Sequence, residues 1–263
     1  MTAAVPPRVR IDRIRCEPGG HVAHVTIDHA RKANALDSAL LEELAGAFEG
    51  LAGEPDIRAA VLAGAGERSF IAGANIAEMQ GLDAESARAF ILRVHRVCRA
   101  IRDLPVPVVA RIQGVVFGAG VEIAAACDFR IAADVATFGM PEVRIGIPSV
   151  VEAALLPQLV GWGRTRWLLL TGETIDAATA LQWGLVEFVV PAAALDAAVA
   201  RSVHAIAVSG PHAIRNQKRL IRTWERLPLD QAIDAGVDAF AHAWSTDEPQ
   251  RMMADVLAAL RRR

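Results

Sequence analysis

One glutamate stands in an otherwise apolar, glycine-rich stretch of the chain. The segment 114–127 contains a single ionisable acid, Glu122. A buried carboxylate is costly unless it is paired, hydrogen-bonded or protonated, and such a cost often accompanies function. An ion pair with an arginine would explain Glu122 as well as a catalytic role would.

The glycines just before Glu122 favour a binding role for this segment. Gly118-Ala119-Gly120 precedes a short apolar helix that we expect over 119–126. The first N–H groups of a helix are unpaired, and the positive end of its dipole lies behind them. The N–H of Ala119 could therefore hold an anionic or polarised oxygen, with Glu122 on the same helix face. The glycine spacing matches neither a dinucleotide-binding nor a Walker fingerprint.

Two further places carry similar chemistry. The segment 70–76 is a second glycine turn with free N–H groups, although it also reads as an ordinary strand-to-helix turn capped by Asn75. Glu142 follows Pro141 in an apolar loop, where Arg144 is its obvious structural partner. Two carboxylates that reach one cleft would suit acid–base work, with pKa values separated by their environments.

The elements that must position these residues change character along the chain. Strands are expected at 9–15, 21–28, 57–63, 106–112 and 129–132, with helices at 38–51, 84–104 and 119–126. From about residue 150 the pattern is helical, at 152–160, 164–171, 177–182, 192–208, 211–224, 229–244 and 249–261, with one strand at 186–190. This predicts an α/β core over 1–200 and a helical C-terminal subdomain over 201–263.

Composition excludes several classes of protein. The chain has 263 residues, 53% hydrophobic and 22% charged, so it is long and apolar enough to bury a core. A net charge of -2 argues against nucleic-acid binding. The three cysteines form no metal-ligand pattern and suggest a reducing compartment. With no secretory signal in 1–10 and no unbroken apolar span, we expect a cytoplasmic protein without a metal or membrane partner.

Taken together, the motifs resemble those of the enoyl-CoA hydratase/isomerase (crotonase) superfamily over nearly the whole chain. They occur in family order as Arg31-Lys32-Ala33-Asn34-Ala35-Leu36, Ala72-Gly73-Ala74-Asn75-Ile76, Gln113-Gly114-x3-Gly118-Ala119-Gly120-Val121-Glu122 and Pro141-Glu142-x3-Gly146-Ile147-Pro148. The resemblance implies a spiral of ββα units with a helical C-terminal subdomain that forms trimers, or hexamers built from two trimers.

The resemblance also implies a reaction. The substrate would be an acyl-CoA thioester, with coenzyme A as part of the substrate and no tightly bound cofactor. Its oxygen would lie between the N–H groups of Ala74 and Ala119. Glu122 and Glu142 would activate water for C3, with Glu142 the donor to C2. Substrate and CoA contacts would come from Arg31, Lys32, Ala33, Ala35, Ala72, Gly73, Asn75, Ile76, Gly118 and Lys218, although solvated surface charge is the simpler explanation of Arg31, Lys32 and Lys218.

Hydration is the reaction that two acids favour, because family members that only isomerise a double bond commonly retain one. An isomerase, another CoA-thioester dehydratase and a catalytically silent scaffold are the alternatives. The chain has no tyrosine, which disfavours branches with a catalytic tyrosine. It departs from the family at Asn75, at Ala119 and above all at Ser149-Val150-Val151-Glu152, where Glu152 is either a third acid or an ordinary helix-N-terminal one.

Overall fold

A six-stranded sheet forms the centre of the computed structural model, which describes residues 8–262. Its strand order is β1 (Val9–Arg15), β2 (His21–Ile27), β3 (Ile57–Gly64), β5 (Val108–Ile112), β7 (Phe129–Ala133) and β10 (Phe188–Val190). The β1–β2 pair is antiparallel and the other pairs are parallel. Parallel strands need both faces covered, which accounts for the nearly continuous apolar runs of β3 and β5.

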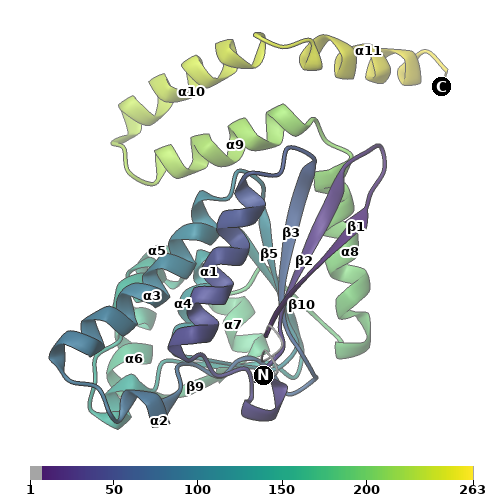
Figure 1. Ribbon diagram of the computed structural model, residues 1–263. Coiled ribbons are helices and arrows are strands. Elements are labelled where there is room, and N and C mark those ends of the chain that lie inside the picture. The colour runs from purple at the N-terminus through teal and green to yellow at the C-terminus, as the bar shows by residue number, and fades with distance from the viewer. Residues whose placement is uncertain (1–7, 263) are drawn as a thin grey trace, which may run out of the picture.

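Helices cover both faces of this sheet (Figure 1). One face packs against α1 (Ser38–Ala52) and α3 (Ala84–Asp103), and the other against α8 (Leu195–Ala207). The N-cap of α1 is Asp37, whose side chain accepts a hydrogen bond from the Leu40 N–H at 2.9 Å. The predicted boundary at residue 200 falls inside α8, which is held on the sheet by Leu195, Val199 and Val203.

A second, four-stranded sheet has no counterpart among the predicted elements. It contains β4 (Ser69–Ile71), β6 (Val115–Phe117), β8 (Thr137–Gly139) and β9 (Thr174–Asp176). Each strand has three residues, which is too short for an alternating pattern to stand out. The pairs β3/β4, β5/β6 and β7/β8 each contribute one strand to each sheet. This repeated step is the spiral expected from the resemblance.

The second sheet determines where the two glycine turns lie. β4 and β6 are parallel neighbours, so their carboxyl ends meet at one edge. α2 (Ile76–Met79) follows β4, and the wholly buried α4 (Ala119–Ala126) follows β6. A Cβ on Gly120 would overlap the Ile71 carbonyl oxygen, so the glycine lets α4 pack directly on β4. The turns at 72–75 and 118–119 therefore lie side by side.

Short helical elements follow β8 along the chain. They are η2 (Glu142–Ile145), η3 (Val151–Leu155), α5 (Leu156–Val160), α6 (Trp162–Thr171), α7 (Ala177–Trp183) and η4 (Ala192–Ala194). The single helix predicted over 152–160 is therefore a 3-10 turn followed by α5. The strand predicted at 186–190 is shorter and starts at Phe188.

Three helices at the C-terminal end form a separate layer (Figure 1). They are α9 (Pro211–Trp224), α10 (Leu229–Ala243) and α11 (Glu248–Leu260), and α10 lies on the side of α9 away from the sheets. No single helix among residues 8–262 is long and apolar enough to cross a bilayer, although the bent pair Ala192–Ala207 and Pro211–Trp224 reaches that length and hydropathy together.

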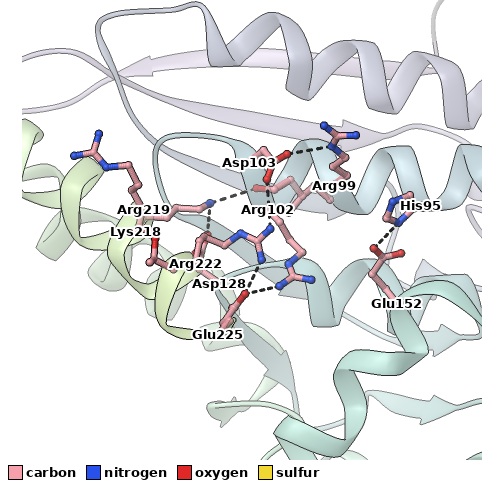
Figure 2. Close-up of polar contacts among 12 residues, drawn as sticks. His95, Arg99, Arg102, Asp103, Asp128, Glu152, Lys218, Arg219, Arg222 and Glu225 are labelled. Atoms are coloured by element: carbon pink, nitrogen blue, oxygen red, sulfur yellow. Dashed lines mark hydrogen bonds and ion pairs between the residues drawn. The ribbon is translucent and has the colours of Figure 1, made fainter. Parts of the chain in front are cut away.

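Lys218 anchors α9 to the core and is not directed at a ligand. Its side chain is buried, and Nζ donates to the carbonyls of Ile101 and Val106 at 3.3 and 2.9 Å and to Asp128 at 2.7 Å (Figure 2). An ammonium group has three N–H donors, so none is left for a phosphate. The suggested CoA contact at Lys218 does not fit this geometry.

We expect Lys218→Met to reduce the free energy of unfolding by about 2–4 kcal/mol, because buried acceptors lose their donor. Urea denaturation followed by circular dichroism measures this. Arg219→Met is the matched control, since Arg219 is an exposed neighbour whose side chain donates to Asn216 on its own helix. Equal stability of the two variants would contradict the anchoring role.

Candidate active site

The two glycine turns open into a cavity of about 580 Å³ between α3, α4 and η2. Eight of the predicted site residues line it: Ala72, Gly73, Ala74, Ile76, Gly118, Ala119, Glu122 and Glu142. The rest of the wall is mostly apolar, from Met79, Leu82, Phe90, Ile91, Val94, Phe117, Ile145, Ile147, Pro148 and Val150. The structure thus gathers two distant turns and two distant acids at one apolar cavity.

Two backbone N–H groups at the cavity wall are free to bind a ligand. Ala119 begins α4, and Ala74 follows Gly73, whose φ of 96° belongs to the left-handed region. The neighbouring groups pair with Leu36: its N–H donates to the Gly73 carbonyl at 2.9 Å, and its carbonyl accepts from Asn75 at 2.7 Å. Within residues 8–262, neither the Ala74 nor the Ala119 N–H donates to another group. The pair could hold one polarised oxygen.

Glu122 is buried without an arginine partner in the described part of the chain. The residue is 3% exposed, and Oε1 accepts a hydrogen bond from the Ala153 N–H at 3.2 Å. Burial, followed by the charge of Glu142, raises the pKa of Glu122 from 4.5 to about 8. Glu122 therefore holds a proton at neutral pH. The sequence left two explanations of Glu122 open, an arginine ion pair and a catalytic role. Among residues 8–262 the ion pair is not observed.

Glu142 begins η2 and lines the cavity. Its Oε2 accepts a hydrogen bond from the Ser149 hydroxyl at 2.8 Å. Its Oε1 lies against Gly118, where a Cβ would overlap it. Arg144, the suggested structural partner, instead pairs with Glu173 at 2.6 Å. The second acid is therefore available to a ligand next to the free Ala119 N–H.

The predicted residues outside the cavity divide into scaffold and surface. The Asn75 side chain accepts a hydrogen bond from the Ala77 N–H at 3.1 Å and so caps α2. This is the strand-to-helix turn capped by Asn75 that the sequence offered as an alternative to a binding role. The Ala33 carbonyl accepts from the Ala72 N–H at 3.1 Å, which joins the early motif to the first glycine turn. Arg31 and Lys32 are exposed in η1 (Ala30–Lys32) and form no ion pair among the described residues.

Ser149 and the Ala153 N–H are functional contacts that sequence reasoning missed. The stretch 149–152 departs from the family pattern, but nothing in its sequence indicates which of its groups contact the two acids. Glu152 does not line the cavity, so it is not a third acid there. It faces α3, where its Oε1 lies 2.8 Å from Nδ1 of His95 (Figure 2). No three His, Cys, Asp or Glu side chains among residues 8–262 gather in a way that could hold a metal ion.

The buried proton on Glu122 predicts a pH-dependent stability. Since the folded pKa of about 8 exceeds the ordinary 4.5, the folded chain retains a proton that the unfolded chain releases. This contribution is fully present below pH 4.5 and is lost as pH rises toward 8. Glu122→Gln removes this pH-dependent contribution. The free energy of unfolding of the variant, relative to that of the unmodified protein, should therefore rise by about 4 kcal/mol from pH 5 to pH 8. Urea unfolding at several pH values checks this. Parallel pH profiles would contradict it, and Glu85→Gln, on an exposed residue, serves as control.

Free N–H donors and two carboxyl groups at one cavity, set on a spiral of ββα units, define an enzyme of the crotonase fold that acts on a carbonyl substrate. The sequence model described as "Enoyl-CoA hydratase/isomerase" matches residues 17–257. The chain belongs to this family.

Relatives over nearly the whole length support this membership. The chain is 34% identical to the short-chain-enoyl-CoA hydratase of Clostridium acetobutylicum, covering 93% of this chain and 94% of that protein. It is 35% identical to the crotonyl-CoA hydratase of Syntrophomonas wolfei, covering 94% and 95%. A crystal structure of the enoyl-CoA hydratase from Bacillus anthracis superposes with a TM-score of 0.90 at 32% identity, covering 96% of each chain.

Proposed function

We propose that this protein adds water across the 2,3 double bond of an enoyl-CoA thioester to give a 3-hydroxyacyl-CoA. The observation that carries the proposal is the meeting of two carboxyl groups, Glu122 and Glu142, at the cavity that also exposes the Ala74 and Ala119 N–H groups. The names of the two relatives described above, both hydratases, support it.

The proposed oxyanion site acts on the charge that develops during addition. As the water oxygen bonds to C3, the electron pair of the double bond moves toward C2 and the thioester oxygen becomes enolate-like. The N–H groups of Ala74 and Ala119 bind that oxygen more strongly as its charge grows, so they stabilise the transition state more than the substrate. The apolar wall keeps bulk water from weakening these bonds.

The two glutamates need one proton between them. In the free enzyme burial places it on Glu122. A water bound between the acids can pass it to Glu142, which lies beside Gly118 and hence next to the thioester end of the cavity. Glu122 then accepts a proton from the attacking water, and Glu142 donates its own to C2. The pair begins and ends with one proton, and dehydration is the same sequence in reverse.

A direct assay with crotonyl-CoA tests the proposal. Purified protein should remove the conjugated enoyl-thioester absorbance and form 3-hydroxybutyryl-CoA, identified by mass spectrometry. Loss of the absorbance without a hydrated product would indicate isomerisation. Binding of a saturated acyl-CoA without turnover of short, long or branched enoyl-CoAs would favour the silent scaffold and overturn the proposal.

We also propose that the protein assembles as a trimer or as a hexamer of two trimers. Large apolar side chains are exposed along α10 and α11, at Leu229, Ile233, Val237, Phe240, Met253, Val256, Leu257 and Leu260. Contiguous exposed apolar surface of this kind favours contact with another subunit. Light scattering coupled to size-exclusion chromatography should give the mass of a trimer or hexamer, and a monomeric mass would contradict this.

A further inference from the structure

Glu152 is a buried carboxylate that the proposed mechanism does not use. The residue is 6% exposed in η3, and its Oε1 lies 2.8 Å from Nδ1 of His95 in α3 (Figure 2). Its Oε2 is buried without a hydrogen-bond partner in the described part of the chain. Buried polar atoms are nearly always satisfied, so an unpaired carboxylate oxygen calls for an explanation.

The short segment around Glu152 contacts both acids of the cavity. The Ser149 hydroxyl donates to Glu142, and four residues later the Ala153 N–H donates to Glu122. Between them Val151 has a φ of 38°, in the left-handed region that β-branched residues strongly avoid. Strain of this kind persists only where surrounding contacts impose it, and it gathers at functional sites.

The Glu152 carboxylate attaches this segment to α3 through His95, with the Cys98 thiol of α3 also facing it. Glu152 directly follows Val151 and directly precedes Ala153, whose N–H donates to Glu122. A shift of η3 away from α3 would therefore move the Ala153 donor away from the Glu122 carboxyl. We propose that Glu152, held by His95, is a positioning residue that fixes the Glu122 carboxyl for catalysis by holding the Ala153 N–H against it. This inference rests on the proposed hydratase function.

The charges around the segment agree with this role. From α3, His95 and the Cys98 thiol face Glu152, and from α4 Glu122 does; α5 has no titratable residue. After burial and Glu142, the negative charge of Glu152 further raises the pKa of Glu122. After burial, the same charge raises the pKa of the Cys98 thiol. Half-exposed His95, when protonated, partly neutralises that charge.

The first test observes the Glu122 proton without relying on activity. The infrared band of a protonated buried carboxyl group, assigned by its loss in Glu122→Gln, is followed against pH. We expect His95→Gln, which breaks the Glu152–His95 contact, to raise its midpoint, because the Ala153 N–H, whose hydrogen bond favours the charged carboxyl, then moves away from Glu122. Glu152→Gln loses the same contact but also removes a like charge, so its midpoint should lie below that of His95→Gln. A merely structural role, in which the Ala153 donor stays in place, predicts no upward shift in His95→Gln.

The second test separates positioning from binding. In Glu152→Gln we expect kcat for crotonyl-CoA to fall about 10- to 100-fold with KM nearly unchanged, because Glu122 is misplaced while the binding walls remain. His95→Gln, on a half-exposed residue, supplies the readout if Glu152→Gln does not fold. Arg99→Gln, an exposed residue one turn further along α3, is the control.

The outcomes distinguish this inference from the proposed function. These infrared shifts in a protein without hydratase activity would support the role of Glu152 in positioning the Ala153 N–H at Glu122, while the proposed function fails. Full hydratase activity in the unmodified protein, with unchanged infrared midpoints and unchanged kcat in both variants, would overturn the inference and leave the proposed function standing.

Discussion

Replacing either Glu122 or Glu142 by glutamine is expected to lower kcat for crotonyl-CoA hydration by about 10²- to 10⁴-fold, the usual contribution of general acid–base catalysis. Glutamine has nearly the shape of glutamate but cannot accept or release the proton. Since each acid handles a different proton transfer, each single variant should already show most of the loss, and the double variant should lose little more.

The two variants should differ in one partial reaction. Glu142 lies against Gly118, beside the free Ala119 N–H, and so is placed to exchange the C2 proton of a saturated acyl-CoA. In deuterated water, Glu142→Gln should lose this exchange, whereas Glu122→Gln should retain most of it. The reverse pattern would assign the C2 proton to Glu122, which already carries a proton in the free enzyme. Activity near the unmodified level in both variants would contradict the pair mechanism.

Replacing Ala119 by proline is expected to reduce kcat by about 10²- to 10³-fold, the typical effect of one lost oxyanion donor. Ala119 is the first residue of α4, where proline is well tolerated because its missing N–H has no partner inside the helix. The substitution therefore removes the donor while it leaves the helix in place. Steady-state kinetics with crotonyl-CoA measures the loss.

Two controls make this result specific. Ala119→Gly keeps the N–H and should retain activity close to that of the unmodified protein. Because the proline ring adds bulk at the cavity wall, butyryl-CoA binding is measured in both variants by calorimetry. Unchanged binding with lost turnover supports the oxyanion role, while retained turnover in Ala119→Pro would show that this N–H does not bind the reacting oxygen.

Much of the central sheet could be predicted from local patterns. Long amphipathic helices such as α1 and α3, and apolar strands such as β3 and β5, bury enough surface for their periodicity to appear in the sequence. The second sheet could not be predicted, because its three-residue strands are stabilised by neighbours far along the chain. Yet this sheet is what brings the turns after β4 and β6 to the same edge.

The sequence by itself determined which groups are chemically available: two acids in apolar surroundings, and glycine turns with free N–H groups. Only the tertiary structure decided the surroundings of each charge. Lys218 became an anchor because α9 buries it against core carbonyls. Glu142 faces the cavity because Arg144 pairs elsewhere, and Glu152 faces α3. The physical reason is that burial and partners set the state of a charged group, and both depend on contacts between segments distant in sequence.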